Sequence, residues 1–255
     1  MAKPKKLDAI CFSYGQEPHL VGPALRDVAK DARVIRTYSP EPYADLARRL
    51  GLDIVPGAWL DQYLIENEKR IEALMLAANK QKPRMIVVGN ETLWRRDLTP
   101  KQLIEYIRRV KAAVPRSIRV TTGEVADRLL EHPEVMRACD CVGMHHYPFW
   151  NGVHIDQSLD SFKRMYERLE RISHKLVVVL ETGWPTGGGS KGAAVASVTN
   201  ARTYFQQVMR WSQEKGVTVF WFEAFDEAWK LETEGPPGPH WGLRTKPGAR
   251  RKYWF

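Results

Sequence analysis

Short apolar runs rich in β-branched residues recur along the whole chain, and this pattern leaves few folds open to it. We expect strands near residues 8–14, 33–38, 53–59, 84–91, 117–123, 140–147, 175–181 and 217–224. Segments with helical periodicity separate these runs; Leu103, Ile107 and Val110, for example, have the spacing of a packed helical face. Strands that alternate with helices indicate an α/β protein with a parallel sheet.

Eight such alternations in 255 residues fit a closed (β/α)8 TIM barrel better than an open, doubly wound sheet. The open sheet usually carries a GxGxxG motif after its first strand, and this chain has none there. The main helices are expected at Pro42 to Leu50, Glu66 to Lys80, Pro100 to Val114, Leu159 to Ile172 and Thr199 to Lys215. A proline-rich segment and a short basic tail follow the last strand, so the final helix should be reduced or absent. We expect a single barrel domain over residues 1–255, either complete or excised from a larger protein.

Two of the expected strands end on a glutamate, one on Glu91 and the other on Glu181. In a barrel both carboxyl groups would point across the same C-terminal mouth, where barrel enzymes place their catalytic groups. Double-displacement glycoside hydrolysis needs two carboxyl groups, one to shuttle a proton and one to attack the anomeric carbon. A structural ion pair would explain either glutamate alone, but the pair, with Asn90 before one and Trp184 after the other, favours catalysis.

The sequences around these glutamates resemble glycoside hydrolase family 17, the β-1,3-glucanases and β-1,3-glucanosyltransferases, in a short, bacterial-type form. Gly89-Asn90-Glu91 matches the acid/base motif, and Glu181-Thr182-Gly183-Trp184-Pro185 matches the nucleophile motif. Further matches are Tyr14-Gly15, Arg36-Thr37-Tyr38, His146-Tyr147-Pro148, Phe225-Asp226-Glu227 with Lys230, and Trp241-Gly242-Leu243. The chain departs from the family at Leu180, where a small residue is usual, and it is shorter than the plant enzymes between strands four and seven.

The resemblance implies a retaining β-glucan-active hydrolase or transglycosylase that acts on β-1,3-glucan through a glycosyl-enzyme intermediate. Glu181 would be the nucleophile and Glu91 the acid/base, with neither a cofactor nor a metal. Aromatic residues, whose rings can pack against sugars, crowd the expected strand ends: Tyr14, Tyr38, Trp59, Trp94, Tyr147, Trp150, Trp184 and Trp229. The substrate-binding residues that we expect are Tyr14, Tyr38, Asn90, Tyr147, Trp184, Glu227 and Lys230. The alternative for Glu227 and Lys230 is a salt bridge at the rim of the barrel that contributes little to stability.

The alternative is a catalytically weak barrel that binds glucan or regulates a larger glucan-synthesis protein. The presence of both glutamates counts against this alternative. The net charge of +9 is compatible with an anionic partner such as nucleic acid. The positive residues fall mostly in helical segments, however, where a solvated outer face explains them, so we expect no nucleic-acid partner. The oligomeric state stays open.

Apolar runs in this chain fall far short of the roughly 18 residues that a membrane-spanning helix needs, so no membrane segment is expected. Asp8 interrupts the first apolar stretch, which leaves no convincing signal peptide. The compartment is therefore open; a periplasmic or extracellular location follows if the chain is a domain of a longer exported or membrane-anchored protein. Cys11, Cys139 and Cys141 are expected to be buried free thiols, because their spacing matches no zinc site.

Overall fold

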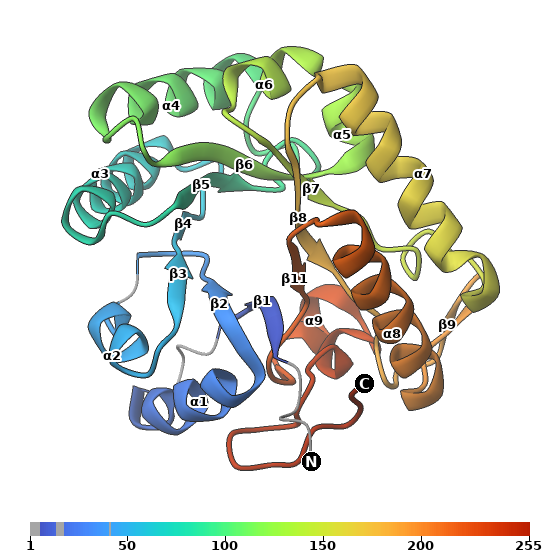
Figure 1. Ribbon diagram of the computed structural model, residues 1–255. Helices are drawn as coiled ribbons and strands as arrows, with labels where there is room; N and C mark the ends of the chain where they lie inside the picture. Colours follow the sequence, from blue (N-terminus) through green and yellow to red (C-terminus); the bar gives the residue numbers. More distant parts are fainter. Residues whose placement is uncertain (1–5, 14–17, 41) are drawn as a thin grey trace.

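The computed structural model describes residues 6–13, 18–40 and 42–255, and it shows a ring of strands surrounded by helices (Figure 1). The order of the strands in the main sheet is β3-β2-β1-β11-β8-β7-β6-β5-β4, and its pairs are parallel. These strands are β1 (Leu7–Cys11), β2 (Ala32–Arg36), β3 (Asp53–Val55), β4 (Gly57–Ala58), β5 (Met85–Asn90), β6 (Arg119–Val125), β7 (Val142–His145), β8 (Val177–Thr182) and β11 (Val219–Trp221). A small antiparallel hairpin of β9 (Ser190–Lys191) and β10 (Ala194–Val195) follows β8.

Strands β3 and β4 are two parts of one barrel strand that Pro56 interrupts. Proline has no N–H to donate to a β-ladder. Its carbonyl still accepts a hydrogen bond from the Val87 N–H of β5 at 3.0 Å, while Val55 on the other side accepts from the Thr37 N–H at 3.0 Å. The two ends of the sheet therefore meet in this strand. The eight strands expected from the sequence are present, and the predicted (β/α)8 barrel is confirmed.

The helices on the outside of the barrel include three that the sequence pattern did not show, α1, α5 and α6. The helices are α1 (Pro18–Asp31), α2 (Ala44–Arg49), α3 (Leu64–Gln81), α4 (Pro100–Ala113), α5 (Ala126–Glu131), α6 (Pro133–Ala138), α7 (Ile155–Ser173), α8 (Val198–Lys215) and α9 (Lys230–Glu234). Helix α1 contains Gly22 and Pro23, the two residue types least favourable to helices. Burial of Leu25 and Val28 against the sheet stabilises it all the same. Helices α5 and α6 are short because Pro133 disfavours a helical conformation at the residue before it.

The C-terminal tail takes the place of a full eighth helix. After β11 the chain forms only the five-residue α9 and a turn of 3-10 helix, η1 (Gly238–His240), which confirms the expected reduction. The tail then runs between α8 and α1. On the α8 side the Gln206 amide donates to the Trp254 carbonyl at 3.1 Å. On the α1 side Asp31 accepts hydrogen bonds from Arg244 at 2.9 Å and from Arg251 at 2.7 Å.

The three cysteines are free and buried, as expected. In the part of the chain that the structure describes, no helix combines the length and the apolar character needed to cross a membrane.

The ion pairs of Asp31 should stabilise the barrel strongly, because its carboxylate is almost fully buried and Arg244 would lose its partner. We expect Asp31→Ala to lower the free energy of unfolding by about 3 kcal/mol, the cost typical of removing one member of a buried pair. Asp8→Ala is the matched control, because Asp8 forms an exposed pair with Arg33 and should change stability by less than about 1 kcal/mol. Urea unfolding followed by circular dichroism measures the stability of both variants. Equal losses would show that the pairing of Asp31 with the tail contributes no more than an exposed ion pair.

Candidate active site

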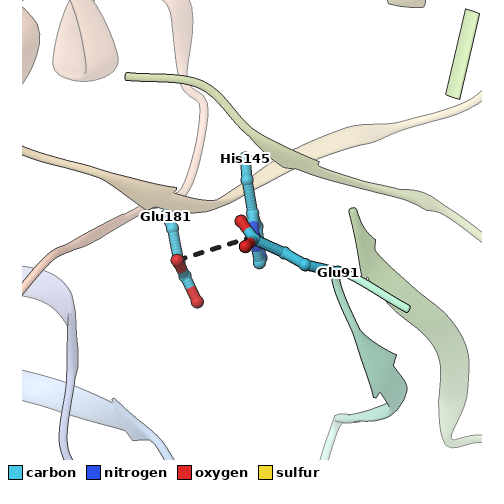
Figure 2. A group of neighbouring side chains, drawn as sticks. All are labelled: Glu91, His145 and Glu181. Carbon is cyan, nitrogen blue, oxygen red and sulfur yellow. Dashed lines mark hydrogen bonds and ion pairs between the residues drawn. The ribbon is translucent and has the colours of Figure 1, made fainter. Parts of the chain in front are cut away.

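The two strand-end glutamates meet at the C-terminal mouth of the barrel, where Glu91 follows β5 and Glu181 lies near the end of β8. Figure 2 shows Glu91 reaching to the ring of His145, the last residue of β7, and Glu181 beside this ring, joined to it by a dashed line. One oxygen of each carboxyl group and one ring nitrogen of His145 lie within 4.8 Å of one another. Retaining glycosidases hold their two carboxyl groups about 5–5.5 Å apart, whereas inverting ones separate them by roughly 6.5–9.5 Å to admit a water. The observed spacing fits the retaining arrangement.

Glu91 is held in an uncommon backbone conformation that turns its side chain into the mouth. Its φ angle is 51°, in the left-handed region that residues other than glycine rarely adopt. The Glu91 N–H donates to the Gly123 carbonyl of β6 at 2.7 Å, which fixes this turn. The side chain is 19% exposed, and its Oε1 lies 2.8 Å from Nδ1 of His145.

Glu181 is more deeply buried, with 6% of its side chain exposed, and donors surround its carboxylate. Arg36 donates to Oε1 at 2.6 Å and Tyr38 donates to the same oxygen at 2.9 Å. Tyr147 donates to Oε2 at 2.7 Å. Burial alone would raise the pKa of Glu181, but the Arg36 guanidinium and the two phenol hydrogen bonds act against burial, and the pKa is lowered. The group is therefore held as a carboxylate.

Arg36 joins the residues of the mouth to one another. It is fully buried at the end of β2 and donates to Glu181, to the Leu180 carbonyl at 3.0 Å and to Oδ1 of Asn90 at 2.6 Å. Because this bond occupies the oxygen of the Asn90 amide, the NH2 group remains to donate to a ligand.

Arg36 also fixes the protonation of His145. Its Nη1 lies 3.1 Å from Nε2 of His145, and a guanidinium can only donate, so Nε2 must accept and Nδ1 must carry the ring proton. That proton points at Oε1 of Glu91. Nδ1 is therefore not free to bind a metal ion, although Glu91, His145 and Glu181 are close enough together to resemble a ligand set.

Gly123 makes room for this contact between Arg36 and His145. A Cβ atom at this position would lie 2.6 Å from Nε2 of His145 and 2.7 Å from Nη2 of Arg36. Both rigid groups would have to move, so any side chain here would disturb the mouth.

His146, next to His145, faces the outer helices instead. Its Nε2 lies 3.4 Å from the Ser161 hydroxyl of α7, and its ring packs near Phe162. Burial lowers its pKa to about 4, so His146 is neutral at ordinary pH. The two histidines point in opposite directions, as adjacent strand residues should.

The structure brings some of the predicted substrate-binding residues into the mouth and buries others away from it. Tyr38 and Tyr147 are half-buried and contact Glu181, as described above, whereas Tyr14 lies outside the described residues. Trp184 departs from expectation because it is fully buried in the core and its Nε1 donates to the Val195 carbonyl at 3.0 Å. Its ring packs against Phe149 and offers no open face to a sugar.

Glu227 and Lys230 form a buried charge cluster with a third residue, Glu223, rather than a salt bridge at the rim. Lys230 is almost fully buried; its Nζ lies 2.8 Å from Oε2 of Glu227 and also binds Glu223. Glu223 accepts a further hydrogen bond from the Ser13 hydroxyl at 3.1 Å. Burial raises the pKa of Glu223 well above its ordinary value, although Lys230 opposes the shift.

Sequence reasoning missed Glu223, Arg36 and His145 as members of the mouth. Each gave a local signal, because each is a charged or titratable residue within an apolar strand run. Such residues are rarely buried without a partner.

Glu124 is a further buried carboxyl group, and it supports the backbone beside Glu91. Its two oxygens accept hydrogen bonds from the N–H groups of Leu93 and Val125, each at 2.8 Å. Burial raises the pKa of Glu124 to about 7 in spite of these bonds, and the nearby Glu91 adds to the increase.

Glu124→Gln should change the pH dependence of stability. Between the ordinary carboxyl value of 4.5 and the folded pKa of about 7, the folded chain holds more protons than the unfolded chain. The contribution of Glu124 to stability is therefore complete below pH 4.5 and falls as pH rises towards 7. Glutamine cannot titrate, so the stability of wild type relative to the variant should fall by up to about 3 kcal/mol over this interval.

Urea unfolding at a series of pH values measures this difference. Glu131→Gln is the control for the loss of a carboxyl group, because Glu131 is exposed on α5. Parallel curves for Glu124→Gln and wild type would refute the raised pKa.

The comparison with known protein families gives one model that matches most of this chain. It is described as the BtgE/BtgC glycoside hydrolase domain and matches residues 21–242. A glucan 1,3-beta-glucosidase of Arthroderma benhamiae is 31% identical over 224 residues, which cover 78% of this chain and 70% of that protein. A probable glucan endo-1,3-beta-glucosidase btgC of Aspergillus fumigatus is 29% identical over 69% of this chain, but only 29% of that longer protein is covered.

Solved structures match the whole barrel. The glycoside hydrolase family 17 β-1,3-glucanosyltransferase from Rhizomucor miehei is 26% identical with a TM-score of 0.83, and 96% of each chain is covered. An active-site mutant of the Rhizomucor miehei β-1,3-glucanosyltransferase, in complex with laminaritriose, is 28% identical with a TM-score of 0.82 and again covers 96% of each chain. An endo-laminarinase from Formosa, 17% identical with a TM-score of 0.76, shares the fold over 95% of this chain and 84% of its own.

Proposed function

Because the chain belongs to the BtgE/BtgC glycoside hydrolase domain family, we propose that it is a retaining hydrolase and transglycosylase of β-1,3-glucan. The observation that carries this proposal is the approach of the Glu91 and Glu181 carboxyl oxygens to within 4.8 Å at one mouth. The names of the relatives, glucan 1,3-beta-glucosidase and β-1,3-glucanosyltransferase, support the substrate and both outcomes of the reaction.

In the first step a carboxylate oxygen of Glu181 attacks the anomeric carbon and forms a glycosyl-enzyme. The glycosidic bond breaks, and the leaving oxygen takes a proton from Glu91. The lowered pKa of Glu181 keeps the nucleophile ionised. Oε1 of Glu91 accepts the His145 proton, so the transferable proton belongs on Oε2.

In the second step Glu91 acts as a base. It takes a proton from water or from a sugar hydroxyl, and the resulting oxygen nucleophile displaces Glu181 from the anomeric carbon with overall retention. Asn90, whose NH2 group is free to donate, is placed to bind the sugar hydroxyl beside the reacting carbon. Tyr38 and Tyr147 hold the carboxylate of Glu181 in position for attack.

The charge cluster of Glu223, Glu227 and Lys230 reaches the mouth through Phe222. Lys230 Nζ lies 4.3 Å from the centre of the Phe222 ring, and Phe222 packs edge-on against Tyr147 at 5.7 Å. Glu227 and Lys230 thus act on substrate binding through the position of Tyr147.

In this proposal residues 1–255 act as one catalytic barrel, a short, bacterial-type form of the family, either complete or part of a larger protein. Its partner is a neutral glucan rather than a nucleic acid. The match of the Rhizomucor miehei structure over 96% of both chains supports the short form.

The separate roles of the two glutamates predict different losses on substitution. Glu181→Gln should abolish formation of the glycosyl-enzyme on every substrate, because no nucleophile remains. Glu91→Ala should lose about 10²–10⁴-fold on oligosaccharides but far less in the first step on aryl glycosides, whose leaving group needs no proton. Steady-state and burst kinetics on both substrate types, with added azide as a replacement nucleophile, measure this. Equal losses for Glu91→Ala on both, with no azide rescue, would show that the acid is misassigned.

The products reveal the substrate and the balance of transfer against hydrolysis. Incubation with β-1,3-linked gluco-oligosaccharides should give turnover, and β-1,4-linked ones should be largely refused. Products longer than the starting sugar should appear at high substrate concentration and diminish on dilution, because water then competes better for the glycosyl-enzyme. Mass spectrometry of the products is the measurement. Comparable rates on both linkages would contradict the specificity, and shorter products alone would contradict transfer.

A further inference from the structure

Trp59, which directly follows β4, lies beside the mouth and is partly exposed. The residue is 38% exposed, although its ring contacts Tyr38 of the mouth and lies under Arg95. Its ring centre lies 6.3 Å from that of Tyr38, with the rings inclined at 63°, and the Tyr38 hydroxyl donates to Glu181. Trp59 is therefore one aromatic ring away from the nucleophile.

Arg95 covers one face of the Trp59 ring. The guanidinium carbon lies 4.3 Å from the ring centre, the distance of a cation–π contact. Hydrogen bonds fix the guanidinium on three sides: to the Leu60 carbonyl at 2.7 Å, to Asp97 at 2.6 Å and to the Asn90 carbonyl.

The same arginine ties Trp59 to the acid/base. The Arg95 backbone N–H donates to the Glu91 carbonyl at 2.9 Å, and its side chain binds the carbonyl of Asn90, the preceding residue. The indole is therefore connected to Glu181 through Tyr38 and to Glu91 through Arg95. A platform held in this way loses little conformational entropy when a ligand binds.

We infer that Trp59 is the platform of a carbohydrate subsite, on which a glucose unit next to the reacting one stacks. Arg95 occupies one face of the indole, so the sugar packs on the opposite face. Tyr38 lies between Trp59 and Glu181, which places the stacked sugar beside the reacting unit rather than at it. This inference rests on the proposed function, because it requires a glucan chain in the mouth.

The chemistry of the site favours a neutral sugar over other ligands. Sugar rings present C–H groups on their faces, which gain dispersion contacts on an indole without desolvating a charge. Arg95 does not favour an anionic ligand, because Asp97 already neutralises its charge at 2.6 Å from Nε. The carbonyls of Asn90 and Leu60 accept hydrogen bonds from its other two nitrogens.

Binding of laminaritriose to inactive protein tests the inference. Glu181→Gln serves as the background, because a substrate without turnover allows affinity to be measured by calorimetry. Adding Trp59→Ala should weaken binding about tenfold, equivalent to about 1.4 kcal/mol. Adding Trp59→Phe, which keeps a smaller ring, should cost less.

Trp254→Ala in the same background is the matched control. Trp254 also has an arginine over its ring, Arg251 at 4.1 Å, but it lies on the C-terminal tail and packs against Phe205 of α8. It should change affinity less than twofold. Circular dichroism and thermal melting confirm that each variant is folded.

Two results would overturn the subsite. One is an affinity within twofold of the background for folded Trp59→Ala, and the other is an equal loss for Trp254→Ala. Both leave the proposed function standing if unmodified protein processes β-1,3-gluco-oligosaccharides. Failure of the Glu181→Gln background to bind, together with no turnover by unmodified protein, would instead remove the proposed function and the subsite together.

Discussion

The buried guanidinium of Arg36 is the interaction on which the mouth depends. It holds Glu181, Asn90 and His145 at once, so one side chain from β2 joins β5, β7 and β8 across the inside of the barrel. Burying a charge is costly unless it is paired and hydrogen-bonded, and Arg36 meets both conditions through Glu181 and the carbonyl of Leu180. Loss of Arg36 would leave Glu181 with two phenol donors. It would also remove the hydrogen bond to Nε2 that fixes the His145 proton on Nδ1.

The sequence predicts the barrel well because its signals are repeated. Eight apolar runs and their spacing are enough for the fold class, and the strand-end position of Glu91 and Glu181 is enough to bring them to one mouth. One helix that sequence reasoning missed, α1, has local signals that oppose the tertiary structure. Helix α1 forms in spite of Gly22 and Pro23 because its apolar side is buried against the sheet.

Side-chain environments were harder to predict than element positions. Trp184 lies in a family-like motif beside Glu181, yet it points into the core, because a residue's face depends on a local turn that sequence spacing does not reveal. Glu223 was missed because its partner Lys230 comes from the turn after the strand, and only the folded chain brings them together. Arg95 likewise acts on Trp59, which lies more than thirty residues earlier in the sequence.

The two glutamates are chemically alike, so their environments must assign their roles. Glu181 is buried and faces Arg36, Tyr38 and Tyr147, all of which donate and therefore favour the carboxylate. Glu91 is more exposed and receives a hydrogen bond from His145 at one oxygen, which leaves the other oxygen open to the mouth to exchange a proton. In the proposed mechanism, a site that fixes one carboxylate firmly and leaves the second accessible suits the first to the role of nucleophile and the second to that of acid/base, without any difference in residue type. The asymmetry originates at the strand ends. Arg36 at the end of β2, with Tyr38 and Tyr147 just after β2 and β7, donates to Glu181, while the left-handed turn after β5 directs Glu91 to His145.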